Sequence, residues 1–189
     1  MRGTVSEETV SPAPEAALID GTPPMRPEEL LAYLESLGIA VTTVSHPPVF
    51  TVEEAKTLRG QLPGGHTKNL FLRNKKGAMW LVTCLEDRAV DLKALAEMLS
   101  AGRFSFGSAG RLMQYLGVVP GAVTPLSVVN DRSQAVQMVL DEGLLSCDVL
   151  NVHPLVNDRT CAMAPKDLLR FLDATDHPPI FLDMEALQL

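Results

Sequence analysis

Cysteine is scarce in this sequence, and the three residues are spaced widely. Cys84, Cys147 and Cys161 form no C-x-x-C pair, and an odd number of thiols does not suggest a disulfide framework. Their spacing also lacks the pattern of a zinc site. We therefore expect a cytoplasmic protein from a reducing compartment, with no metal and no other cofactor.

Long hydrophobic runs are missing as well. No apolar run approaches the roughly 18 residues that a membrane-spanning helix needs. The N-terminus is acidic and contains prolines, and it lacks the basic region followed by an apolar region that marks a signal peptide. We expect no signal peptide and no association with a membrane.

The signatures of several enzyme classes are also absent. The chain has no G-x-S-x-G nucleophile elbow, no P-loop, no H-E-x-x-H and no G-x-G-x-x-G that opens a helix. These absences argue against α/β-hydrolases, P-loop nucleotide hydrolases, zinc proteases and dinucleotide-binding enzymes. A functional site must therefore be sought in other combinations of residues.

The 189 residues have an ordinary soluble composition, with 46% hydrophobic and 21% charged residues. The length suits one domain with a core and a tail. We predict that residues 1–25 are a mobile extension, that residues 26–175 form the domain, and that residues 176–189 are a tail. The tail packs either on the body or on a second copy, and the oligomeric state stays open.

The apolar periodicity predicts helices and strands in an irregular order. The expected helices cover about 27–37, 52–59, 91–99, 108–116 and 165–172. The expected strands cover about 40–45, 68–73, 78–85, 134–140, 147–153 and 159–163, with a hairpin turn at Asn74–Gly77. A run of strands with inserted helices favours an α+β fold with a mixed sheet over a doubly wound parallel sheet.

The stretch from Gly64 to Leu72 contains the leading candidate residue. A flexible diglycine precedes Lys68 and Asn69, and an apolar strand follows them. The strand would hold the stem of Lys68 while its ammonium faces a phosphate or a carboxylate, which suits a compact charge with three donors. The same pattern also fits a lysine that ends a loop with its head in water.

A second feature is a histidine at the end of a predicted strand. His153 follows apolar residues and precedes Pro154, which terminates the strand. An imidazole in this place can line the mouth of a pocket. A half-buried structural histidine is the alternative interpretation.

The third feature is a loop that prolines stiffen at both ends. It comprises Gly121, Ala122, Val123, Thr124 and Pro125 and follows Pro120. The glycine lets the backbone approach a ligand closely, and the prolines restrict the conformation. Backbone N–H groups of this loop could bind a carbonyl or a ribose, unless the loop is a plain connector.

Charge is distributed unevenly along the chain, whose net charge is −7. Residues 56–111 hold ten Lys/Arg and four Asp/Glu, a net +6, whereas the rest of the chain has a net −13. The middle segment could therefore face a polyanion. Its candidate contacts are Lys56, Arg59, Arg73, Lys75 and Lys76. The alternative is a set of solvated charges that do not converge in space.

Four motifs occur together in this chain. Thr51–Ala55 reads T-V-E-E-A, His66–Leu72 reads H-T-K-N-L-F-L, Gly121–Pro125 reads G-A-V-T-P, and Asn151–Pro154 reads N-V-H-P. Their order resembles the YbaK/prolyl-tRNA-synthetase editing-domain superfamily, and in particular its free-standing branch that hydrolyses alanyl-tRNA(Pro). The resemblance covers about residues 26–175.

The resemblance implies a single α+β domain built around a mixed, mostly antiparallel, barrel-like sheet with helices around it. The implied reaction is hydrolysis of the ester that joins a wrong amino acid to the 3′ end of tRNA(Pro). In the family the residue at Lys68 is essential, Asn69 is implicated, and His153 lies in the amino-acid pocket. The mischarged tRNA acceptor end would be the partner, and prolyl-tRNA synthetase could be another.

An aminoacyl ester is already activated, so the absence of a catalytic triad is no obstacle. Positioning water and stabilising the oxyanion could suffice, with Asn69 and backbone N–H groups of residues 121–124 as donors. The ribose 2′-hydroxyl could help to activate the water. Lys68 would anchor the terminal phosphate rather than act as a base, because exposed lysines are protonated at pH 7.

Size would decide which amino acid is removed. We expect Lys68 to face residues 121–125 across a cavity that admits alanine but is too narrow for a proline ring, with His153 as part of the wall. Three alternatives remain: removal of cysteine, serine or threonine instead, a non-catalytic tRNA-binding or regulatory module, and a small-molecule amidase or acyl-binding protein. Lys68 and Asn69 beside an intact loop argue against the non-catalytic module.

Overall fold

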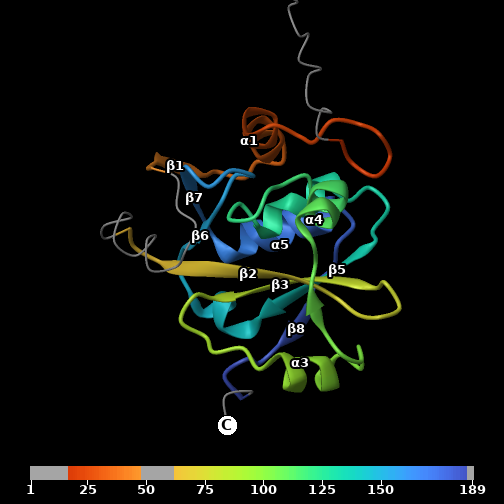
Figure 1. Cartoon of the computed structure of the whole chain (residues 1–189). Helices are drawn as coiled ribbons and strands as arrows, with labels where there is room; N and C mark the ends of the chain where they lie inside the picture. Colours follow the sequence, from red (N-terminus) through yellow and green to blue (C-terminus); the bar gives the residue numbers. More distant parts are fainter. Residues whose placement is uncertain (1–16, 48–61, 187–189) are drawn as a thin grey trace, which may run out of the picture.

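The protein is described by a computed structural model that covers residues 17–47 and 62–186. Eight strands form a mixed sheet in the order β1-β7-β6-β2-β3-β5-β8, with β4 beside β2 (Figure 1). The strands are β1 Thr42–Ser45, β2 Gly65–Arg73, β3 Met79–Leu85, β4 Ser105–Phe106, β5 Val136–Asp141, β6 Leu150–Val152, β7 Arg159–Met163 and β8 Ile180–Leu182. The predicted α+β class with a mixed sheet is confirmed.

The helices begin and end at residues that the sequence marks for this purpose. They are α1 Pro27–Ser36, α3 Leu92–Met98, α4 Ala109–Leu116 and α5 Pro165–Ala174, with the 3-10 helices η1 Pro125–Asn130 and η2 Glu142–Ser146. Proline opens α1 and α5, where its missing N–H is not needed. The Asp91 carboxylate caps α3 by accepting the N–H groups of Lys93 and Ala94. None of the described helices is long and apolar enough to cross a membrane.

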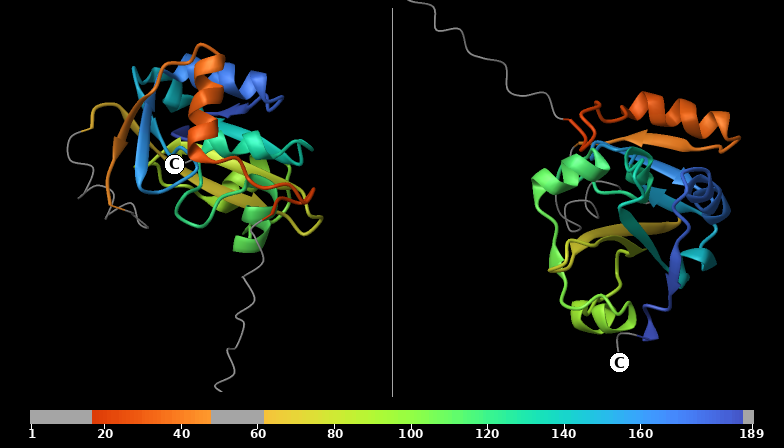
Figure 2. Two further views of the ribbon diagram at one scale, coloured as in Figure 1. Left: turned by 90° about the horizontal axis from the view of Figure 1, so that it is seen from above. Right: turned by 90° about the vertical axis from the view of Figure 1, so that its right-hand side faces the viewer.

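Two hydrophobic cores lie on opposite faces of the sheet. Helices α1, α4 and α5 cover one face and α3 lies on the other (Figures 1 and 2). Because side chains alternate along a strand, Phe71 and Leu81 enter the larger core while Leu72 and Val82 enter the smaller one. Strands β2 and β3 are therefore packed on both faces, which fixes the direction of every side chain along them.

Strand β2 joins the two halves of the sheet. It pairs with β3 in an antiparallel hairpin, in which Phe71 lies opposite Leu81. Its first two residues, Gly65 and His66, pair in parallel with Leu150 and Asn151 of β6. The strand thus begins three residues before the predicted start at residue 68, because the glycines take part in this second pairing.

Both ends of the described chain pack on the body. At the N-terminal side Leu18 is buried, and the Ile19 N–H donates to the Gln114 carbonyl at 2.7 Å. Packing therefore begins before residue 26, the start of the domain expected from the sequence. At the C-terminal side β8 pairs with β5 and Met184 is buried. The sequence did not predict η1, η2 or β8, and the predicted helix at 52–59 lies outside the described residues.

Candidate active site

The two predicted catalytic residues are neighbours on β2, so their side chains point to opposite faces of the sheet. Asn69 shares its face with Phe71 and the larger core. Lys68 shares its face with Leu70 and lies opposite Cys84 of the smaller core on β3. Lys68 and Asn69 therefore contact different groups, one on each face of the sheet.

Asn69 connects β2 to β3 and to the loop at residues 121–125. Its Nδ2 donates to the Val123 carbonyl at 2.9 Å, and its Oδ1 accepts from the Thr83 hydroxyl at 2.7 Å. Thr83 is fully buried. Both ends of the Asn69 amide are thus engaged, which suits a side chain that holds the loop against the strand.

The loop itself is held by its own backbone and by the start of η1. Gly121 has φ of 90°, a conformation that favours glycine. The Ala122 N–H donates to the Val119 carbonyl at 3.0 Å, so this predicted oxyanion donor is already used. The Thr124 carbonyl accepts from the Ser127 hydroxyl at 2.6 Å, and Pro125 opens η1. The loop is therefore a defined turn next to Asn69.

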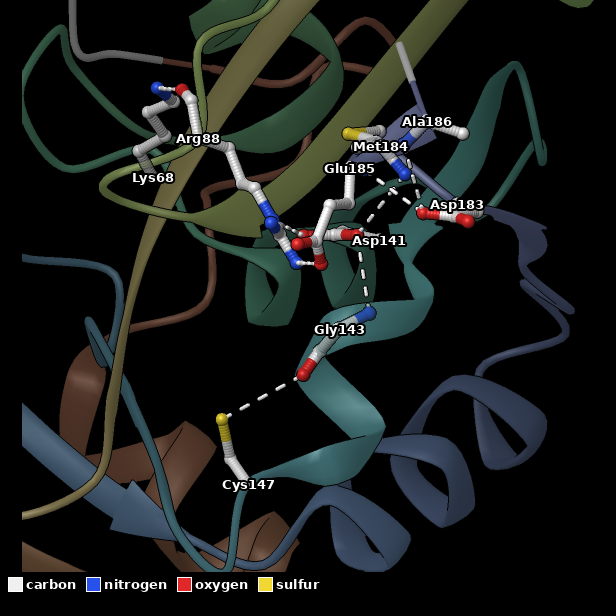
Figure 3. Close-up of polar contacts among 9 residues, drawn as sticks. All are labelled: Lys68, Arg88, Asp141, Gly143, Cys147, Asp183, Met184, Glu185 and Ala186. Atoms are coloured by element: carbon white, nitrogen blue, oxygen red, sulfur yellow. Dashed lines mark hydrogen bonds and ion pairs between the residues drawn. The ribbon is translucent and has the colours of Figure 1, made fainter. Parts of the chain in front are cut away.

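On the face opposite Asn69, the amine of Lys68 is directed to a backbone carbonyl. Lys68 is half-buried, and its Nζ donates to the carbonyl of Arg88 (Figure 3). We expected this amine to face residues 121–125, but Asn69 makes the contact with that loop instead. The thiol opposite Lys68 is unreactive in character, because burial raises the pKa of Cys84 to about 11 even though the charge of Lys68 lowers it.

His153 follows directly after the last residue of β6, Val152. Within β6, Asn151 pairs in parallel with His66, which lies two residues before Lys68. The Nδ1 of His153 lies 3.0 Å from the Arg159 carbonyl, which requires a proton on Nδ1. The structure therefore fixes the orientation of the imidazole.

A second histidine, which sequence reasoning did not place in the site, accompanies His153. The rings of His46 and His153 have centroids 6.4 Å apart, and the Nε2 of His46 lies 2.9 Å from the Thr160 hydroxyl. Thr160 is also part of the wall of a cavity of about 230 Å³ over β1, β6 and β7. The lining is mainly apolar and comprises Thr42, Val44, Leu62, Pro63, Val149, Asn151, Thr160 and Ala162.

A cavity of about 290 Å³ opens at the start of β2. Its lining comprises Gly64, Gly65, His66, Leu85, Glu86, Asp87 and Arg88. Arg88, whose carbonyl accepts from Lys68, is part of this lining, whereas Lys68 itself is not. Arg88 was not predicted as a site residue, since a contact through a backbone carbonyl leaves no signal in the identity of the side chain.

The predicted basic contacts do not gather around Lys68. Arg73, Lys75 and Lys76 lie at the β2–β3 turn, and Lys75 and Lys76 are exposed. Arg73 lies five positions after Lys68, roughly 17 Å along a strand. Lys56 and Arg59 lie outside the described residues. Binding of RNA by this set therefore stays a prediction.

Metal binding has no obvious place in the described chain. Within residues 17–47 and 62–186, His, Cys, Asp and Glu form no group of three or more that could hold a metal ion. The polar groups of the site are instead amides, hydroxyls, imidazoles and one amine. Such groups can bind, orient and polarise a substrate that carries phosphate, ribose and carbonyl oxygens.

Comparison with known proteins gives a consistent result. The sequence model of the aminoacyl-tRNA editing domain family matches residues 46–171. "Prolyl-tRNA synthetase associated domain-containing protein 1" from Xenopus laevis is 40% identical, over 84% of this chain and 96% of the relative. "Prolyl-tRNA editing protein ProX" from Acetoanaerobium sticklandii is 35% identical, over 78% of this chain and 90% of the relative.

A solved structure extends the comparison to the fold. A crystal structure described as that of a proposed trans-editing enzyme for prolyl tRNA synthetase superposes with a TM-score of 0.63. It is 21% identical and covers 91% of this chain and 98% of its own length. The fold is therefore shared at low identity. The family match over residues 46–171 includes the whole of β2. The chain belongs to the aminoacyl-tRNA editing domain family.

Proposed function

We propose that this protein is a trans-editing deacylase that removes a wrong amino acid, alanine in the first place, from tRNA(Pro). One observation carries the proposal within the family. Lys68 is half-buried, and its amine donates to the backbone carbonyl of Arg88, a residue that lines a cavity at the start of β2. A cation held in this way is suited to an anionic group of an aminoacylated 3′ end.

Each residue has a distinct part in the proposed site. Lys68 binds the terminal phosphate or another polar group of the substrate. His153 forms part of the wall around the amino acid. Asn69 fixes residues 121–125 against β2 and leaves one N–H of its amide for the substrate. The resemblance to the family further implies that residues 121–125 contact the substrate directly.

The proposed reaction is an ester hydrolysis without a covalent intermediate. The oxygen of a water molecule attacks the ester carbonyl carbon, and the bond from that carbon to the ribose oxygen breaks. One proton of the water is transferred to the leaving ribose oxygen, and the products are free alanine and tRNA(Pro). Because the ester is activated, positioning and oxyanion stabilisation by preorganised donors account for the acceleration.

We propose that shape and contacts in the bound state, rather than the volume of the empty cavity, discriminate against proline. The mainly apolar cavity of about 230 Å³ near His46 is the candidate place for the side chain of the amino acid. A missing methylene changes binding by only about 1–3 kcal/mol, so the synthetase cannot fully exclude alanine. A tighter second site can reject proline by collision. Prolyl-tRNA synthetase, the source of the mischarged tRNA, is a proposed partner.

A panel of aminoacylated tRNAs tests the proposal. The wild type should release alanine from Ala-tRNA(Pro) and leave Pro-tRNA(Pro) intact. Lys68→Ala should lower kcat/KM by about 10²-fold or more, the size expected for loss of one preorganised donor. Lys166→Ala, at an exposed position of α5, is the matched control and should keep full activity.

Other outcomes of the panel are equally informative. Preferential release of cysteine, serine or threonine would keep the reaction and replace the substrate. Salt-sensitive tRNA binding without release would indicate a non-catalytic module. Absence of release from every tRNA at micromolar enzyme would end the deacylase proposal.

A further inference from the structure

Arg88 connects Lys68 to the C-terminal part of the chain. Its backbone carbonyl accepts from the Lys68 amine, and its guanidinium points to two carboxylates (Figure 3). The Nε lies 3.1 Å from Asp141 Oδ2, and a terminal nitrogen lies 3.1 Å from Glu185 Oε2. One residue thus joins the candidate catalytic amine to the end of β5 and to residues 183–186.

The contact with Asp141 is a buried ion pair. The side chain of Asp141 has no exposed surface, and that of Arg88 is 17% exposed. The other oxygen of Asp141 accepts the N–H groups of Gly143 at 3.2 Å and Met184 at 3.4 Å. A buried charge of this kind is held in one geometry, because loss of either partner leaves the other uncompensated.

The C-terminal segment closes over this pair. Met184 is 1% exposed within the smaller core, next to the β8 strand that pairs with β5. Asp183 accepts the N–H groups of Glu185 at 3.0 Å and Ala186 at 3.2 Å, which turns the chain toward Arg88 (Figure 3). The carbonyl that receives Lys68 is therefore anchored by parts of the chain more than fifty residues away from it.

We propose that Arg88 is a positioning residue for Lys68, and that the Asp141 pair and the C-terminal segment fix it. This inference rests on the proposed function for the catalytic consequence, but its structural part stands apart from it. Without the pair, the chain around residue 88 gains freedom and the Lys68 amine loses its fixed acceptor. Small displacements of a positioned group are costly, because the reacting atoms must be held within a fraction of an ångström.

Deacylation kinetics test the catalytic consequence. Arg88→Gln keeps the backbone carbonyl and removes the ion pair. Because Lys68 is proposed to bind the substrate, this variant should lower kcat/KM by about tenfold or more, mainly through a higher KM. Arg88→Lys keeps the charge without the fork geometry and should recover part of the loss. Arg132→Gln is the matched control, because the Arg132 side chain contacts Asp20 and Thr22 at exposed positions, and it should show wild-type kinetics.

A double variant separates positioning from general destabilisation. If Arg88 acts through Lys68, then Lys68→Ala combined with Arg88→Gln should be no slower than Lys68→Ala alone. Rates are compared at equal folded fraction, measured by circular dichroism at the assay temperature. Multiplication of the two single effects in the double variant would overturn the proposal.

Lysine labelling tests the structural part even if the protein has no deacylase activity. Limited acetylation followed by peptide mass spectrometry gives the relative rates at Lys68, Lys75 and Lys76. Lys68 should react more slowly than the two exposed lysines in the wild type, and Arg88→Gln should raise its rate several-fold without changing theirs. An unchanged Lys68 rate in Arg88→Gln would overturn the proposal, whereas an inactive wild type would overturn only the proposed function.

Discussion

Asn69 differs from Lys68 in the number of its partners within the fold. Its amide bridges the Val123 carbonyl and the fully buried hydroxyl of Thr83. A side chain with both ends engaged is placed to position residues 121–125. We therefore regard Asn69 as a positioning residue first and as a substrate contact second.

Removal of this side chain should affect both stability and turnover. Asn69→Ala deletes two hydrogen bonds and leaves the buried Thr83 hydroxyl without its acceptor, so unfolding should cost about 1–3 kcal/mol less. Thr83→Val removes only one of these bonds at similar shape and should cost less than Asn69→Ala. Urea unfolding measures the free energies, and kcat for Ala-tRNA(Pro) should fall more in Asn69→Ala. Equal stability of Asn69→Ala and wild type would contradict the bridging role.

Single residues also show how far the sequence alone leads. Strand alternation already implies that Lys68 and Asn69 lie on opposite faces, so their separation could have been predicted. Thr83 was detectable as a polar residue at an inward position of the apolar strand β3. Arg88 was not, because its contact with Lys68 uses the backbone and its charge pairs with a residue 53 positions later.

At the scale of elements, the end of α4 shows how one turn joins three segments. Gly117 ends the helix with φ of 66°. A Cβ there would lie 2.6 Å from the Asn130 Nδ2 and 2.8 Å from the Pro24 Cβ. Asn130 in turn donates to the Leu116 carbonyl and accepts from the Met25 N–H. The turn, η1 and the N-terminal segment are thus packed too closely for any side chain at 117.

Two glycine substitutions separate backbone strain from collision. Gly117→Ala should destabilise through both the left-handed conformation, at about 1–2 kcal/mol, and displacement of Asn130 and Pro24. Gly77→Ala is the matched control, because its φ is 89° but no atom lies within 4 Å of the added Cβ. Denaturant unfolding should therefore show a larger loss for Gly117→Ala. Equal losses would mean that the close packing around Gly117 relaxes freely.

Elements with strong local signals were predicted well, and short elements were not. Helices α1, α3, α4 and α5 carry prolines, caps or a closing glycine, and their starts agree with the sequence. Strand β8 has three residues, too few for hydrophobic alternation to show. The 3-10 helices η1 and η2 are five or six residues long and have no periodicity of their own. Their positions depend on packing rather than on local preference.

For the whole molecule, buried polar side chains join both ends of the described chain to the body. Asn130 accepts from Met25, 105 residues away, and Asp141 accepts from Met184, 43 residues away. The Oδ2 of Asp131 lies 3.3 Å from the Nε2 of His177, 46 residues away. Separations of this size leave no pattern in a sequence, so the places where the ends dock could not be predicted. They make the ends part of one cooperative structure.

The Asp131–His177 contact leads to a prediction about acid stability. Burial opposes the charge of Asp131, but hydrogen bonds from His177, Val136, Ala135 and Ser133 outweigh it and lower the pKa of its carboxyl. A folded pKa below the unfolded value of roughly 3.9 stabilises the protein above that pH. This contribution is lost as the pH falls through the folded pKa.

Asp131→Asn should therefore flatten the loss of stability at acid pH. At pH 7 the variant should unfold more easily by about 1–3 kcal/mol, because the amide cannot replace the charged acceptor. Between pH 5 and roughly pH 2, its unfolding free energy should fall less steeply than that of the wild type, since the lowered pKa is no longer present. Asp173→Asn, at an exposed position of α5, should behave as the wild type throughout. Parallel pH profiles for Asp131→Asn and wild type in urea unfolding would show that this carboxylate does not couple protonation to folding, and that the docking of His177 rests on packing alone.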